Sequence, residues 1–254
     1  MRLMLGKLPR KYHEKTLFFH KYFVAVPPTP PVSYYDLRLR QDAWGMLGND
    51  QVGDCAIAAP CHQAILSNSY TQASANPTTA TAYNMYSAVS GYDPSQTDVN
   101  GNNPTDVGCA LTDVWDYLMR QGIILGWVAI DWNNLEHVRA ALNIFGGLQR
   151  GVQLPQSAMD QFNSGQPWSV VANDGGILGG HAIFDTGYRE PAAVAPYRTV
   201  TWAQCIPKTP GWDAKYTDEL YALIFKSWLS LKSQMSPSHL NFTALQNDLQ
   251  ALQQ

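Results

Sequence analysis

The stretch of sequence that decides the fold runs from residue 48 to residue 59 and reads Gly48-Asn49-Asp50-Gln51-Val52-Gly53-Asp54-Cys55-Ala56-Ile57-Ala58-Ala59. Its first half is rich in turn residues and ends at Asp54, a residue type that often caps the N-terminus of a helix. The small apolar residues that follow predict the first turns of a buried helix. Cys55 would then lie in the first turn, where free backbone N–H groups and the helix dipole stabilise a thiolate. Such a cysteine is a candidate nucleophile if a histidine reaches it from elsewhere in the fold.

The chain offers a suitable histidine in the segment Gly179-Gly180-His181-Ala182-Ile183-Phe184. Gly179 and Gly180 carry no side chains, so a substrate backbone can approach His181 closely. His62 is a poorer candidate, because a residue seven positions after Cys55 on one helix lies about 10 Å along the axis. We expect His62 to be structural.

Composition excludes several classes of protein. The 254 residues suffice for one large domain or for a domain with a subsidiary lobe. A net charge of −3 with 15% charged residues provides no basic field, so no nucleic-acid partner is expected. The sequence has no apolar run of about 18 residues and no signal-peptide-like N-terminus, so neither a membrane span nor export is expected. The four cysteines form no C-x-x-C pair, which favours reduced thiols inside a cell: Cys55, Cys61, Cys109 and Cys205.

Residues 1–43 form a separate N-terminal strap in this interpretation. Basic residues alternate with aromatic ones, and the proline-rich segment 26–31 predicts an extended conformation. Two interpretations are open: an arm that packs its aromatic side chains along the domain surface, or a pro-segment that lies over the active site.

The remaining chain, 44–254, divides by pattern into a helical lobe (about 44–147), a β-rich lobe (about 148–235) and a C-terminal helix (about 236–254). Helices are predicted from Cys55 to about Tyr70 and at Thr79–Ser90, Ala110–Gln121 and Leu135–Phe145. Strands are predicted at Gly151–Leu154, Trp168–Val171, Ala182–Phe184 and Tyr197–Trp202, whereas Glu219–Phe225 fits a strand or a helix. The loop 93–104 has the Asp/Asn alternation of a calcium loop but neither its glycine nor its glutamate at the right place, so we expect no metal.

The order of these elements resembles that of papain-like cysteine peptidases, in which a cysteine opens a helix and a β-rich half carries the histidine. The resemblance implies an α+β fold. The Asp54-Cys55 pair is similar to the bacteriocin-leader-processing branch of that superfamily. Three segments resemble a group of poorly characterised papain-like proteins from tailed phages and bacteria: Leu47–Ala59, Gly179–Tyr188 and Val200–Ala203.

The resemblance implies that Cys55 is the nucleophile and His181 the base, as a thiolate–imidazolium pair that forms an acyl-enzyme. The oxyanion hole would combine the Cys55 backbone N–H with an upstream side-chain amide. The family's glutamine lies six residues before the cysteine, where this chain has Asn49, while Gln51 has the right type only four residues before. Spacing favours Asn49 and residue type favours Gln51, and both are retained.

The third catalytic position departs from the family pattern. The strand after the histidine strand normally carries Asn or Asp, and here it offers Thr201, a neutral acceptor, followed by Trp202, which would cover the His181 contact. Asp185 would lie about 13 Å along the strand from His181, which is too far. If Thr201 does not orient His181, the site is a dyad or is degenerate.

Two functional hypotheses follow. The first is a cysteine hydrolase that cleaves amide bonds in a peptide or other acyl substrate, and also activated esters, with no cofactor or metal. The second is a non-catalytic or degenerate papain-like protein with a binding or virion-associated role. In both, the setting would be intracellular or phage-associated, and the oligomeric state is left open. No serine-hydrolase, phosphate-loop or zinc-protease motif competes with these hypotheses.

Overall fold

The computed structural model describes residues 3–22, 43–71, 75–189 and 194–225, together with positions 245 and 247. The helices are α1 (Cys55–Thr71), α2 (Thr79–Ser90), α3 (Leu111–Arg120), α4 (Leu135–Phe145), α5 (Gln156–Asn163) and α6 (Pro210–Tyr216). The strands are β1 (Leu17–Phe18), β2 (Ile124–Ala129), β3 (Leu148–Pro155), β4 (Ile177–Tyr188), β5 (Tyr197–Thr201), β6 (Gln204–Lys208) and β7 (Thr217–Phe225). Short 3-10 turns occur at Phe19–Tyr22 and Pro94–Gln96.

Within the described ranges the strands form one seven-stranded sheet in the order β1-β2-β7-β3-β4-β5-β6. Only the β1–β2 pair is parallel there, and every other pair is antiparallel. Strands β3 and β4 pair so that Val152 lies opposite His181 and Gly151 lies opposite Ala182. The candidate histidine therefore lies near the start of a central strand. The fold is α+β, as expected.

Side chains alternate between the two faces of the sheet and bury both of them. Tyr221 and Leu223 of β7 pack into the core that contains α1, α2 and α3. Leu220 and Ala222, one residue out of phase, pack on the opposite face with α4. A third cluster joins β3 and β4 to α5 and α6. Because both faces are covered, the sheet is a rigid base for the residues at the start of β4.

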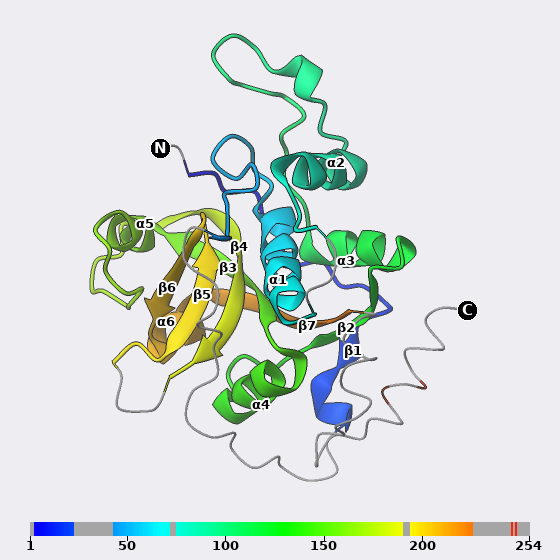
Figure 1. The fold of residues 1–254 in the computed structure, drawn as a ribbon. Helices are drawn as coiled ribbons and strands as arrows, with labels where there is room; N and C mark the ends of the chain where they lie inside the picture. The colour runs from blue at the N-terminus through cyan, green and yellow to red at the C-terminus, as the bar shows by residue number, and fades with distance from the viewer. Residues whose placement is uncertain are drawn as a thin grey trace.

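Helix α1 lies in the middle of the molecule, beside β4 (Figure 1). Its first nine residues, 55–63, are all buried, as expected for a helix whose first turns are small and apolar on every side. Helices α2 and α4 have the boundaries expected from sequence and end at Gly91 and Gly146, which adopt the left-handed conformation.

Several elements differ from the sequence-based expectations. The strand expected at Trp168–Val171 is wrong: only Trp168 forms an isolated bridge, to Lys208. The segment Glu219–Phe225 lies within strand β7. The expected helical stretch 44–147 contains β2, which joins the sheet, while α5, β6 and α6 were not foreseen. The expected C-terminal helix lies outside the described residues except at positions 245 and 247, which are both helical, and the proline-rich segment 26–31 lies outside them entirely.

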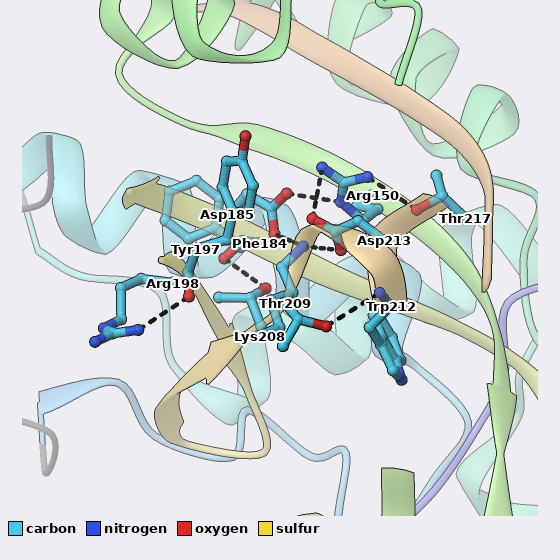
Figure 2. Close-up of polar contacts among 11 residues, drawn as sticks. Arg150, Phe184, Asp185, Tyr197, Arg198, Lys208, Thr209, Trp212, Asp213 and Thr217 are labelled. Carbon is cyan, nitrogen blue, oxygen red and sulfur yellow. Dashed lines mark hydrogen bonds and ion pairs between the residues drawn. The ribbon is translucent and has the colours of Figure 1, made fainter. Parts of the chain in front are cut away.

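Four buried charged side chains form a cluster of ion pairs in the β-rich part of the molecule, as Figure 2 shows. Arg150 of β3 donates to Asp185 of β4 at 2.7 Å, and Lys208 of β6 lies 2.8 Å from the other Asp185 oxygen. Lys208 also pairs with Asp213 of α6 at 2.6 Å, and Arg150 donates to the Thr217 hydroxyl at 2.8 Å. Two cations thus balance two carboxylates in an environment that excludes water. Asp185 belongs to this cluster, and not to the histidine.

Candidate active site

Cys55 is the first residue of α1, and the preceding loop fixes its position. The backbone N–H groups of Ile57 and Ala58 donate to the Asp54 carbonyl, so Asp54 occupies the N-cap position. Its carboxylate, however, accepts no hydrogen bond from the N–H groups of the first helical turn, which contradicts the expectation that this side chain caps the helix. Burial raises the pKa of Asp54 to about 8, and the charge of Asp106 adds to the shift. Burial thus favours the protonated form of Asp54.

Asp106 holds the loop from the other side. Both of its oxygens accept the Gly53 backbone N–H, at 2.9 and 3.1 Å, and one accepts the Tyr86 hydroxyl at 2.6 Å. The role of Asp106 was not predicted from the sequence, because it contacts Gly53 across a separation of 53 positions in the chain.

His181 is anchored through one ring nitrogen. Its Nε2 lies 2.7 Å from the Thr201 Oγ1, and its Nδ1 has no hydrogen-bond partner among the described residues. Trp202 stacks on the imidazole with ring centroids 4.3 Å apart and an interplanar angle of 20°. If Nε2 carries the proton and donates it to Thr201, the lone pair of Nδ1 is free to act as a base.

A strained turn presents Trp202 to the histidine. Trp202 and Ala203 connect β5 to β6 as a two-residue hairpin loop, and both have positive φ angles, of 44° and 62°. Such turns normally use Asn and Gly, so a tryptophan here carries a conformational cost. The surrounding aromatic contacts fix the ring, which also packs edge-to-face on Phe162.

The structure brings the cysteine and the histidine to one place. The backbone N–H of Ala182, the residue that follows His181, lies beside the Cys55 thiol and lowers its pKa. Gly179 and Gly180 precede the histidine on β4. The candidate nucleophile at a helix start and the candidate base on β4 thus converge from positions 126 residues apart in the sequence (181 − 55).

The two candidate amides of the oxyanion hole have different environments. Asn49 is buried, and its Nδ2 donates to the Val52 carbonyl at 3.2 Å. Gln51 is exposed, and its amide donates to the carboxylate of its neighbour Asp50 at 3.3 Å. Asn49 is therefore the amide held inside the protein beside the Cys55 loop.

Residues 4–8, here called segment 4–8, lie across the cysteine. The backbone N–H of Gly6 lies beside the Cys55 thiol and lowers its pKa, and the Gly6 carbonyl accepts from the Cys109 N–H at 2.9 Å. The Lys7 N–H donates to the Gly180 carbonyl at 3.1 Å, directly before His181. A Cβ atom at Gly6 would lie 1.7 Å from the Gly53 carbonyl oxygen. Only a glycine fits between the cysteine loop and this segment.

Burial keeps both reactive groups neutral under this cover. Cys55 is 1% exposed, and burial raises the pKa of its thiol to about 11, although the Ala182 N–H lowers it. His181 is fully buried, and burial lowers the pKa of its imidazole to about 3. The described conformation therefore holds a thiol and a neutral imidazole. His62, by contrast, bonds through Nε2 to the Gly45 carbonyl at 3.0 Å, as a structural histidine does.

Two kinds of feature are absent from the described part of the chain, a cluster of metal ligands and a membrane-spanning helix. No group of three or more potential metal ligands is found there. None of its helices is long and apolar enough to span a bilayer.

The sheet, the central buried helix that begins at a cysteine, and the order of elements define an α+β fold similar to papain-like folds. No family model matches the sequence, and no curated protein matches it. Among solved structures, the fold is similar to that of xylellain, a cysteine protease from Xylella fastidiosa, with a TM-score of 0.58 and 12% identity over 89% of this chain and 98% of that chain. Digestive procathepsin L 3 from the larval midgut of Tenebrio molitor matches with a TM-score of 0.44 and 11% identity, over 88% of this chain and 74% of that chain.

Proposed function

We propose that this protein is a cysteine hydrolase that cleaves amide bonds in peptides and is held in a latent state by its own N-terminal segment. One observation carries the proposal: Cys55 at the start of α1 contacts the residue after His181, whose Nε2 is anchored on Thr201 while Nδ1 is unpartnered. A nucleophile, an oriented base and a free basic nitrogen are the components that acyl transfer needs.

The chemistry would proceed once segment 4–8 has moved away. His181 Nδ1 takes the thiol proton, and the Cys55 thiolate attacks the carbonyl carbon of the substrate. The developing oxyanion is stabilised by the Cys55 N–H at the helix start, with Asn49 as the nearby side-chain donor. The imidazolium then protonates the leaving amine, and water hydrolyses the acyl-enzyme with His181 acting as base.

The orientation of segment 4–8 favours inhibition over self-cleavage. A substrate must present a carbonyl carbon to the sulfur, whereas Gly6 presents its N–H and has its carbonyl bound by Cys109. The segment also excludes water, and this accounts for a thiol and an imidazole that are both neutral. Of the two interpretations of the strap, these contacts support the one in which a pro-segment lies over the active site.

The second candidate function is a papain-like protein that has lost its chemistry and serves in binding or in a phage particle. The neutral Thr201 in place of a carboxylate or amide favours it, because a hydroxyl stabilises an imidazolium less well than a charged partner. The intracellular or phage-associated setting expected from cysteine usage belongs to both proposals.

Selective alkylation and peptide hydrolysis test the first proposal. The full chain and its Gly6→Ala variant, in which segment 4–8 cannot keep its position, are incubated with iodoacetamide, with a peptide epoxide and with a fluorogenic peptide library. We expect one adduct, on Cys55, together with turnover that both Cys55→Ala and His181→Ala abolish.

Cys61→Ala is the matched control. Cys61 is buried in the same helix, and burial raises its pKa to about 12, so this variant should keep both the adduct and the turnover. Labelling of Cys55 that is no faster than that of Cys61 in the Gly6→Ala variant, with no peptide turned over, would refute the hydrolase and favour the binding protein.

A further inference from the structure

Lys7 is buried next to the catalytic pair, which is unusual for a lysine. Its side chain is fully buried, and its ammonium lies 2.9 Å from Glu219 Oε1 and 3.0 Å from Asp218 Oδ2. It also donates to the Leu8 carbonyl at 2.9 Å. Gly151 of β3 provides the space, because a Cβ atom there would lie 2.2 Å from the Lys7 Cε.

Other residues hold the two carboxylates in place independently of Lys7. Asp218 Oδ2 accepts from the Gln153 amide at 2.6 Å, and Glu219 Oε2 accepts from the Tyr221 hydroxyl at 3.1 Å. Glu219 is 1% exposed, and its Oε1 faces only the Lys7 ammonium among the described residues. Without segment 4–8, this oxygen would lose the ammonium group that it faces, so it is free to bind another cation.

Lys7 and the two carboxylates lie close to Cys55 and His181. The Lys7 backbone N–H donates to Gly180, next to His181, and Gly151 pairs with Ala182, whose N–H lies beside the Cys55 thiol. A backbone that bonds to Gly180 can therefore place its side chain between the two carboxylates while it passes the nucleophile.

From this geometry we propose that Gly151, Asp218 and Glu219 form the specificity site of the enzyme, which binds a basic side chain, lysine above all, near the scissile bond of a peptide substrate. Lys7 fills this site in the latent form. The inference rests on the proposed hydrolase and adds its substrate class.

Two pairs of peptidyl acyloxymethyl ketones test this assignment on the full chain. Within each pair one reagent carries lysine and the other carries norleucine, which has no ammonium group, at the first or at the second residue from the ketone. Rates of Cys55 labelling are measured by intact mass for wild type, for Lys7→Ala, and for Lys7→Ala combined with Asp218→Asn and Glu219→Gln. The triple variant leaves no charge unpaired, so it is the matched control for Lys7→Ala.

We expect lysine to accelerate labelling about tenfold or more at one of the two positions, in wild type and in Lys7→Ala, as charge-assisted hydrogen bonds predict. The preference, measured in each protein as the ratio of the lysine rate to the norleucine rate, should disappear in the triple variant. Equal rates for lysine and norleucine with clear labelling of Cys55 would overturn the specificity site alone. No Cys55 adduct in any variant with any reagent, iodoacetamide included, would overturn the hydrolase and this inference with it.

Discussion

Gly6→Ala adds one methyl group at a tight contact between segment 4–8 and the loop that precedes Cys55. The new Cβ atom would lie 1.7 Å from the Gly53 carbonyl oxygen, which is backbone and cannot rotate away. Asp106 fixes the Gly53 N–H, so the loop has little freedom to retreat. The segment should therefore leave its place over Cys55, and its contacts with Cys109 and Gly180 should break.

The expected effect on Cys55 can be worked from its ionisation. With a pKa of about 11, roughly 0.03% of the thiol is ionised near about pH 7.5. If exposure returns the pKa to its ordinary value of 9.0, about 3% is ionised, an increase of about a hundredfold. The helix start and a His181 that can now accept a proton would increase it further. Alkylation of Cys55 should therefore accelerate by about 10² or more.

The assay is the rate of iodoacetamide labelling by intact mass, with the adduct located by peptide mapping. Gly211→Ala is the matched control, because a Cβ atom at Gly211 would meet no other atom within 4 Å. Both variants should have wild-type circular dichroism. A folded Gly6→Ala variant that labels no faster than Gly211→Ala would refute the conclusion that segment 4–8 shields the nucleophile.

Three further changes probe the site and its support. Thr201→Val should lower kcat/KM by about 10²-fold and cost about 1–3 kcal/mol in urea unfolding, because the His181 N–H loses its acceptor, whereas Thr201→Ser should restore both. Lys208→Met leaves Arg150 as the one remaining cation beside two buried aspartates and should cost about 3–5 kcal/mol in the same assay, whereas Lys215→Met, at the surface, should have a much smaller effect. Asp54→Asn should raise the free energy of unfolding at neutral pH. The pKa of Asp54 is about 8 in the folded protein and ordinarily 3.8, so the folded protein loses stability as pH rises between these values, by up to about 1.4 kcal/mol per pH unit. The free energy of unfolding of the variant, measured across pH 4–9, should lack this slope.

Local signals predicted α1 to α4, whereas α5 and α6 were missed. The Gly91 and Gly146 stops, the N-terminal residues of α2 and α4, and the apolar run after Cys55 are all encoded within a few residues of where they act. Strand β6 was missed because Pro207 argues against a strand. The structure places β6 at the edge of the described sheet, where a proline needs no partner for its missing N–H.

The contacts around Cys55 could be predicted only in part. The candidate pair of Cys55 and His181 was identified because each residue lies in a recognisable local motif. The burial of Lys7 could not be identified in this way, because its partner Asp218 lies 211 residues further along the chain and neither residue belongs to a motif. The balanced cluster around Lys208 was hidden for the same reason, since four charges on separate elements meet only after the sheet has formed.

Segment 4–8 remains covalently joined to the domain it covers, so it acts as an intramolecular ligand. A tethered ligand competes at an effective concentration set by the length of its tether, about millimolar for short flexible linkers, and dilution of the protein does not weaken it. A free peptide must exceed that concentration, or bind more tightly, to displace the segment. A single cut directly after Leu8, before the contacts that Lys11, Thr16 and β1 make with the domain, would turn the segment into an ordinary dissociating peptide, and dilution alone would then release it from Cys55.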